Sequence, residues 1–189
     1  MYQKNEYYER YGKWVMVSFR MVRADKDRAI PSRVQGLGII DAELYYIKKE
    51  DLLHPNGKLK VDENDIPYMD EINIKSYLWV LGVYELFRAF DQRLREDSSL
   101  ATDEAILAVK GAKDSFARLR VPLAKLEPSK KYKGVDWDIS KIGVYEDALA
   151  WKLNDNLIFR YTKLSDYALD VMRMIWPRGS PMAKTSKKP

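Results

Sequence analysis

The stretch from Asp70 to Asp97 constrains the fold more than any other part of this sequence. Its apolar side chains recur at intervals of three and four residues and cover most of the circumference of a helix. Only a narrow polar stripe interrupts them, and it consists of Lys75, Gly82, Glu85, Arg88, Gln92 and Arg95. A helix with so little polar surface needs neighbours on nearly every side, so we expect it at the centre of a helical bundle.

Other segments have the one-sided periodicity of helices that pack around such a centre. Aromatic and aliphatic residues between Tyr7 and Val22 follow the helical spacing, although Trp14 to Val17 also fits a buried strand. Leu52 to Asp70 contains two prolines, a glycine and four consecutive polar residues, and it is predicted to be a long loop.

Residues at the expected helix ends mark the boundaries. Asp41 is predicted to cap a short helix that runs through Lys49, and Thr102 a longer one with acidic residues in its first turn. Pro122 should kink or end that longer helix, because proline lacks a backbone donor. Ser165 is predicted to cap the last helix. The stretch from Asp25 to Gly38 is predicted to be a connection, because it holds charges followed by one proline and two glycines.

The C-terminal third indicates a small amount of β-structure. Residues 148–163 alternate with a period of two around the turn-forming triplet 154–156, which favours a β-hairpin, although 146–153 alone also fits a helix. The predicted fold class is therefore mainly α, a four- to five-helix bundle with a small β-hairpin near the C-terminus. We expect one helical domain over 1–176 and a disordered basic tail over 177–189, where prolines, small residues and lysines cannot bury enough surface.

The composition excludes several chemistries. The chain has no cysteine, so disulfides, thiol nucleophiles and cysteine-ligated metal sites are excluded. Its single histidine, His54, lies in a turn-forming Pro-Asn-Gly context, so mechanisms that need two histidines are excluded as well. No cofactor is expected. The longest uncharged apolar stretch, Ser76 to Tyr84, is too short to cross a bilayer, and the N-terminus lacks a secretory signal, so we expect a cytoplasmic protein without membrane contact.

Charge is distributed unevenly along the chain. The overall net charge of +5 combines a balance of +6 between Lys110 and Lys133 with a balance of −5 between Asp41 and Glu71. A basic stretch of this kind attracts phosphate backbones, although it also fits a solvated helix face. The candidate nucleic-acid-binding residues are Lys113, Arg118, Arg120, Lys125, Lys130, Lys131 and Lys133.

Two smaller sets of residues are further candidates. Glu85 and Arg88 share one helix face and are expected to form a semi-buried ion pair, unless that face lines a cleft in which Arg88 and Arg95 would hold an anionic ligand. Asp136 and Asp138 flank a tryptophan, and alternate residues of an extended segment could chelate a magnesium ion.

The helical layout and the basic stretch invite comparison with the HEPN group of small helical nucleases. Members of that group that cleave RNA carry an arginine and, after four to six intervening residues, a histidine. Upstream of His54 the corresponding positions are Ile47, Lys48 and Lys49, so the motif is missing and no residue role is carried over. A catalytically silent relative stays open on fold analogy alone.

These observations favour a non-enzymatic binding module with an acidic partner, either nucleic acid or an acidic protein surface. The first alternative is a metal-assisted phosphodiester hydrolase around Asp136 and Asp138. The second is a subunit of a larger assembly, including a homo-oligomer, whose aromatic faces pack against other chains.

Overall fold

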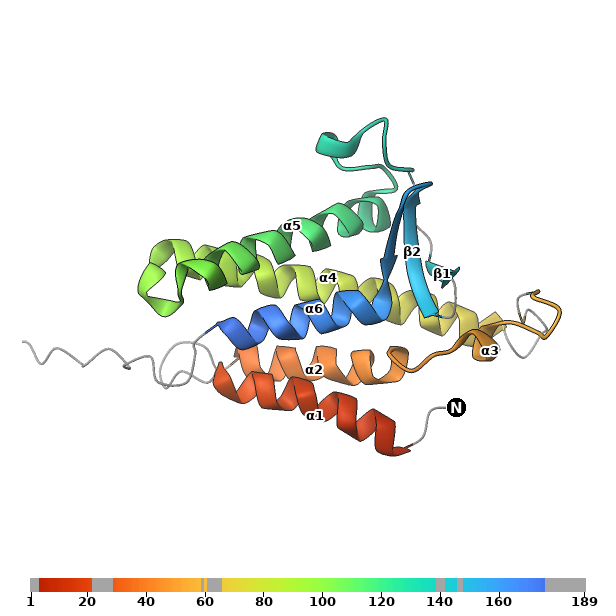
Figure 1. Ribbon diagram of the computed structural model, residues 1–189, viewed down its shortest axis with the longest axis horizontal. Helices are drawn as coiled ribbons and strands as arrows, with labels where there is room; N and C mark the ends of the chain where they lie inside the picture. The colour runs from red at the N-terminus through yellow and green to blue at the C-terminus, as the bar shows by residue number, and fades with distance from the viewer. Residues whose placement is uncertain are drawn as a thin grey trace, which may run out of the picture.

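The computed structural model describes residues 4–21, 29–58, 60, 66–138, 142–145 and 148–175 (Figure 1). The described residues form six α-helices, two short 3-10 helices and three strands, which confirms a mainly α fold with a small sheet near the C-terminus. In chain order the elements are α1 (Lys4–Arg20), α2 (Ala29–Leu44), α3 (Lys49–Leu52), α4 (Ile66–Glu96), η1 (Ser98–Leu100), α5 (Asp103–Lys125), η2 (Lys130–Tyr132), β1 (Ile142–Tyr145), β2 (Ala148–Asn154), β3 (Leu157–Arg160) and α6 (Tyr161–Met174).

The long helix α4 lies at the centre, as its nearly continuous apolar surface predicts. Its Trp79 is fully buried and contacts aromatic rings from three other helices. The ring centroid of Trp79 lies 6.3 Å from Trp14 of α1, 5.7 Å from Phe116 of α5 and 4.8 Å from Tyr161 of α6. Burial of such large rings contributes most of the hydrophobic stabilisation of a core. Trp79 therefore joins α1, α5 and α6 to α4.

Helix α2 corrects two predictions. The predicted connection from Asp25 to Gly38 is wrong from Ala29 onward, because α2 begins there, and residues 25–28 lie outside the described residues. Pro31 is tolerated because it sits in the first helical turn, where its missing N–H would have no partner. Gly38 is needed for close packing, since a Cβ there would overlap Trp14 of α1. Asp41 lies in the last turn of α2, so the prediction that it caps a helix is also wrong.

Helix α5 begins as predicted and ends one turn after its proline. The Thr102 hydroxyl accepts a hydrogen bond from the Ala105 N–H at 3.3 Å, which confirms the cap. Pro122 lies inside the helix, which continues to Lys125. Leu126 then takes the left-handed conformation with φ 57°, and its N–H donates to the Pro122 carbonyl. This unusual backbone at a leucine ends the helix sharply and redirects the chain.

The predicted hairpin is confirmed, and a further strand extends it. The strands are antiparallel in the order β1-β2-β3, with Trp151 opposite Phe159 and a bulge between Lys152 and Asn154. Side chains alternate along β2, so Trp151 and Leu153 are buried against the helices. Helix α6 follows β3 directly, with Arg160 at its N-cap position. The prediction that Ser165 caps this helix is wrong.

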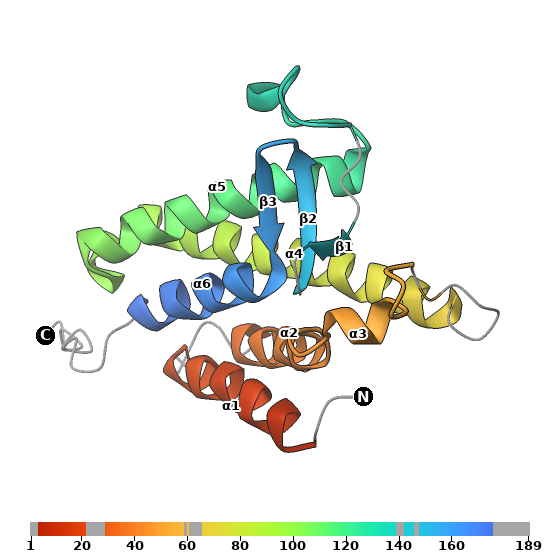
Figure 2. The same cartoon turned by 45° about the vertical axis from the view of Figure 1, so that its right-hand side comes forward.

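The elements are arranged in layers (Figures 1 and 2). α1 and α2 pack as a pair on one side, α6 runs between this pair and α5, and the sheet stands where α6 begins. Residues 126–138, which follow α5, project from the opposite side. Among the described residues, no helix combines the length and the apolarity that crossing a bilayer would need. The predicted tail over 177–189 lies outside the described residues.

Candidate functional site

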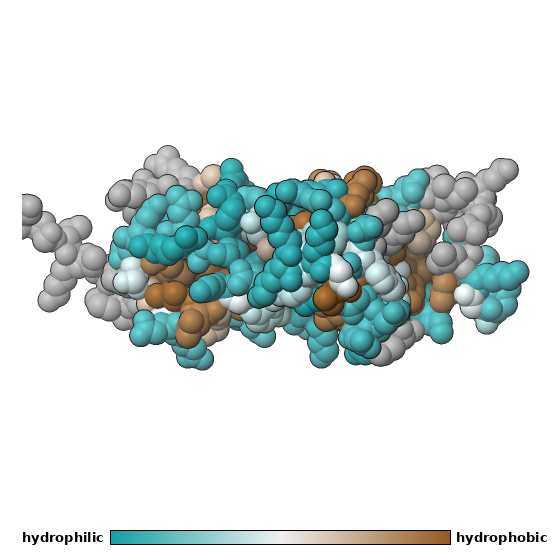
Figure 3. Space-filling model, turned by 90° about the horizontal axis from the view of Figure 1, so that it is seen from above, coloured by the Kyte–Doolittle hydropathy of each residue, from teal (hydrophilic) through white to brown (hydrophobic). Residues whose placement is uncertain are grey.

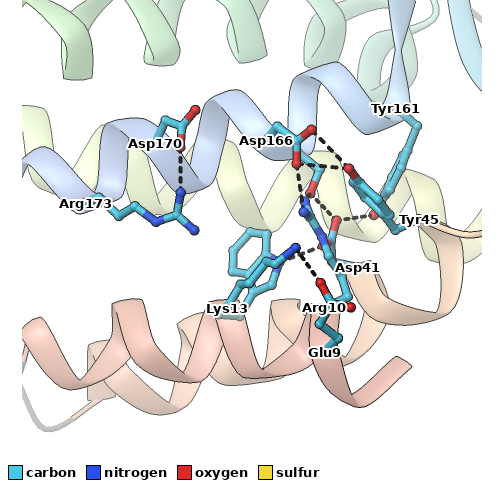
Figure 4. A network of polar contacts seen from close by, with 11 residues as sticks. Glu9, Arg10, Lys13, Asp41, Tyr45, Tyr161, Asp166, Asp170 and Arg173 are labelled. Atoms are coloured by element: carbon cyan, nitrogen blue, oxygen red, sulfur yellow. Dashed lines mark hydrogen bonds and ion pairs between the residues drawn. The ribbon is translucent and has the colours of Figure 1, made fainter. Parts of the chain in front are cut away.

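A buried polar network joins α1, α2 and α6 (Figure 4). The Arg10 guanidinium, 1% exposed, donates from Nε to Asp41 at 2.6 Å and from Nη1 to Asp166 at 2.7 Å. The fully buried Asp41 carboxylate accepts further hydrogen bonds from Trp14, Tyr161 and Ser165. Buried charges are tolerated only when they are paired and hydrogen-bonded, and this network meets both conditions.

The titration behaviour of the network agrees with a structural role. Burial lowers the pKa of Arg10, but Asp41 and Asp166 raise it above the ordinary value, so the guanidinium stays charged. Burial raises the pKa of Tyr45 to about 12 and that of Tyr161 well above 10, so both phenols stay neutral. Because the Asp41 carboxylate has no exposed surface, a substrate cannot reach it. The network therefore holds three helices together, and it reaches the surface only toward Asp166, whose side chain is 45% exposed, and Tyr45.

Sequence reasoning missed this network. A signal was present, because Arg10 interrupts the aromatic face formed by Tyr7, Tyr11 and Trp14 in the first helix. A charged residue on an apolar helix face needs a buried partner.

The best candidate for function is the connecting loop, residues 126–138 between α5 and β1, which projects from the helices (Figure 1). It is anchored at Asp136, whose carboxylate accepts two hydrogen bonds from Arg118 of α5 at 2.7 and 2.8 Å. Asn154 of β2 donates to the same carboxylate at 2.8 Å. Two-point pairing of arginine with carboxylate fixes orientation as well as distance.

Two more contacts hold the connecting loop in place. The Arg118 guanidinium carbon lies 3.6 Å from the ring centroid of Tyr132, so the guanidinium contacts this ring in addition to its hydrogen bonds with the carboxylate. The backbone N–H of Trp137 donates to the Leu153 carbonyl at 2.8 Å. The hydrogen bond from Arg118 lowers the pKa of Asp136 below its ordinary range, and the same bond raises the pKa of Arg118. We call the contacts of Asp136 with Arg118 and Asn154 the anchor. Arg118 and Asp136 in the anchor therefore form a full ion pair at neutral pH.

The outer surface of this loop carries cations and apolar groups. Four exposed lysines, which we call the loop lysines, lie at the end of α5 and along the loop: Lys125, Lys130, Lys131 and Lys133. Leu126 and Val135 are more than half exposed, and Trp137 is 43% exposed with Lys152 of β2 at 4.9 Å from its ring centroid. Seen from the side of the loop, the molecule is mostly hydrophilic with apolar patches in between (Figure 3).

The other predicted basic residues have partners within the fold. Lys113 pairs with Asp91 at 2.6 Å, and Arg118 pairs with Asp136. Arg120 lies with its guanidinium carbon 4.7 Å from the ring centroid of Tyr84. Among the candidate residues, Lys113, Arg118 and Arg120 are thus engaged within the fold, whereas the loop lysines are exposed, with Lys131 lying 5.4 Å from the ring centroid of Tyr132.

The predicted anion site on α4 lies on the surface. Arg88 pairs with Glu85 at 2.6 Å, but both side chains are about half exposed, so the expected semi-buried pair is wrong. Arg95 pairs with Asp91, which Lys113 also contacts. Burial raises the pKa of Asp91, yet the hydrogen bonds from Lys113 and Arg95 outweigh it and leave the pKa below its ordinary value. Both arginines are therefore paired on the helix that carries them.

The two aspartates of the predicted metal site have different surroundings. The Asp136 carboxylate is engaged by Arg118 and Asn154, so a cation there would have to displace Arg118. Asp138 is exposed. Over the described ranges, no group of three or more acidic or histidine side chains is arranged to hold a metal ion. His54 is exposed beside the predicted turn.

Comparisons with known proteins add no assignment. The chain matches no protein-family model, no curated protein and no solved structure. The candidate site therefore rests on its own geometry.

Proposed function

We propose that this protein is a non-enzymatic module that binds single-stranded nucleic acid through the connecting loop. The observation that carries the proposal is the combination of the loop lysines with the exposed indole of Trp137 on one anchored loop. Lysines neutralise backbone phosphates and release counterions, which supplies affinity without sequence preference.

Trp137 favours nucleic acid over an acidic protein as the partner. An exposed aromatic ring stacks on any base, and single strands present unstacked bases to it. A purely acidic protein surface would use the lysines but would leave this ring without a matching group. The overall charge of +5 also favours encounter with a polyanion.

The anchor supports the proposal because it reduces the entropy lost on binding. A loop already held by Arg118, Asp136 and Asn154 has less freedom to lose when a strand docks on it. In addition, Asp136 is the carboxylate nearest in sequence to Lys133, and its charge is offset by Arg118 instead of competing for the lysines.

Fluorescence anisotropy with a short labelled single-stranded RNA tests the proposal. Replacing all four loop lysines by glutamine should weaken binding by at least about a hundredfold at low salt, because each phosphate contact contributes to affinity. A matched control replaces four exposed lysines elsewhere by glutamine: Lys4, Lys48, Lys49 and Lys58. The control has the same net charge and should retain most of the affinity.

Equal weakening in the two quadruple variants would mean that only net charge matters and would refute the loop as the site. Binding of an acidic polypeptide such as polyglutamate as tightly as RNA, with no loss in Trp137→Ala, would instead favour an acidic protein partner.

A further inference from the structure

A recess on the described surface is separate from the connecting loop. It is open to solvent, has a volume of about 590 Å³, and is lined by α5, β1, the β2–β3 turn, β3 and the first turns of α6. Figure 2 shows these elements side by side, with α6 starting at the base of β3. This volume is within the usual range for small-molecule sites.

Aromatic rings and cations line this recess together. The side chains that matter for recognition are Ser115, Tyr145, Phe159, Arg160, Lys163 and Tyr167. Rings accept a planar base and cations accept a phosphate, so the recess has both halves of a nucleotide site. Asp155 also lines the recess, but its carboxylate pairs with Lys152 at 3.2 Å, so its charge is offset.

Polar groups in the recess are available to a ligand. Within the described part of the chain, no hydrogen bond or ion pair engages the side chains of four of these residues: Ser115, Tyr145, Lys163 and Tyr167. In contrast, Lys113 and Arg118 on α5 are each paired with a carboxylate. An exposed lysine beside aromatic rings, without an acidic partner, is suited to bind a phosphate.

Lys152 links the recess to the connecting loop. Its ammonium lies 4.9 Å from the ring centroid of Trp137 on one side and 3.2 Å from Asp155 of the recess on the other. Ile158, opposite Lys152 across the hairpin, also lines the recess. Lys152 and Ile158 of the hairpin thus lie between Trp137 of the connecting loop and the recess.

From this arrangement we infer that the recess is a nucleotide subsite, which holds one nucleotide of the strand bound by the connecting loop. Its base lies against the rings of Tyr167 and Phe159, and its phosphate is bound by Lys163. This inference rests on the proposed function, because the nucleotide belongs to a strand bound by the connecting loop. A free nucleoside monophosphate offers the same base and phosphate, so the recess should bind it in the same way.

Titrations with AMP, adenosine and inorganic phosphate, followed by NMR chemical shifts or calorimetry, test the recess directly. Lys163→Gln should weaken AMP binding about tenfold and leave adenosine binding nearly unchanged, because one charge-assisted hydrogen bond is lost. Tyr167→Leu should weaken both ligands, whereas Tyr167→Phe, which keeps the ring, should not. Lys110→Gln, an exposed lysine of α5 outside the recess lining, is the matched control.

The same variants separate the two proposals. If AMP binds the recess but the loop-lysine variant binds RNA normally, the proposed function fails and the recess stands. If the loop-lysine variant loses RNA while Lys163→Gln changes neither AMP nor RNA affinity, the recess inference is overturned and the proposed function stands. Phosphate binding equal to that of AMP would also overturn it, since the rings would then contribute nothing.

Discussion

At the scale of single residues, Asp41 lies at the centre of the buried polar network. Its carboxylate is fully buried and accepts hydrogen bonds from Arg10, Trp14, Tyr161 and Ser165. Hydrogen bonds to a buried charge are strong because the surroundings screen them poorly. If the charge of Asp41 is removed, the buried guanidinium of Arg10 keeps only Asp166 as a charged partner.

We therefore expect Asp41→Asn to destabilise the fold by about 3 to 5 kcal/mol, the usual cost of breaking a buried ion pair. Urea unfolding followed by circular dichroism measures the loss. As a control, Asp170→Asn removes an exposed carboxylate that pairs with Arg173, and its effect should stay within about 0.5 kcal/mol. Similar losses in the two variants would show that the network contributes no more than a surface pair.

The buried Tyr161 and the partly buried Tyr45 predict a loss of stability in alkali. In the folded state the pKa of Tyr161 is raised well above 10, and the pKa of Tyr45 is raised to about 12. In the unfolded chain the pKa of both phenols is about 10. The folded state therefore holds these protons more tightly, and stability falls as pH rises above the unfolded pKa. Tyr161→Phe should flatten this decline above about pH 10. An unchanged decline in the free energy of unfolding would contradict the assignment.

The residue scale is also where prediction from sequence was weakest. Arg10 and Asp166 are separated by 156 residues, and no local periodicity pairs residues so far apart. Ser165 illustrates the error, because a serine near a helix start resembles a cap. Here its hydroxyl instead faces the buried carboxylate of Asp41.

At the scale of elements, glycine explains why a helix was predicted to be a connection. Gly36 and Gly38 weaken local helix propensity, which is the only information a short window carries. In the structure, Gly38 permits α1 and α2 to approach closely at Trp14, and tertiary packing outweighs the propensity cost. The hairpin and Thr102 cap were predictable because their signals are local.

Gly38→Ala should destabilise the protein by about 1 to 3 kcal/mol, because the added methyl group overlaps Trp14. Gly36→Ala is the matched control, since no atom outside its own helix lies within 4 Å of the added methyl group. It should be neutral or stabilising by up to about 1 kcal/mol through better helix propensity. Thermal unfolding of both variants decides the point, and equal effects would refute close packing at Gly38.

The anchor of the connecting loop gives a prediction at the same scale. Asp136→Asn should speed amide hydrogen exchange over 126–138 and weaken RNA binding several-fold, although all four loop lysines remain. Asp138→Asn, an exposed neighbour, should change neither. If both variants bind RNA like the unmodified protein, preorganisation by the anchor is refuted.

The anchor also predicts a pH dependence. Because the folded pKa of Asp136 is lowered, its ion pair contributes stability above the unfolded pKa of about 3.9 and loses it as pH falls toward the folded value. The free energy of unfolding should therefore fall less steeply with decreasing pH in Asp136→Asn; we call this decline the acid limb of the stability curve. An identical acid limb would contradict the lowered pKa.

At the scale of the whole molecule, the core and the connecting loop share one helix. α5 buries Phe116 against Trp79 and, half a turn later, directs Arg118 to Asp136. The position of the loop is thus set by the core, as expected for a binding site carried on a rigid scaffold. The sequence indicated the basic stretch but not its division, because partners such as Asp91 for Lys113 come from a neighbouring helix.

The salt dependence of RNA binding tests the central claim most directly. For a single strand, the slope of log K against log salt concentration changes by about 0.7 for each phosphate contact. If the loop lysines make these contacts, replacing all four by glutamine should reduce the magnitude of the slope by about 3. The four-lysine control variant should keep the slope of the unmodified protein. The same slope in all three proteins would contradict the account.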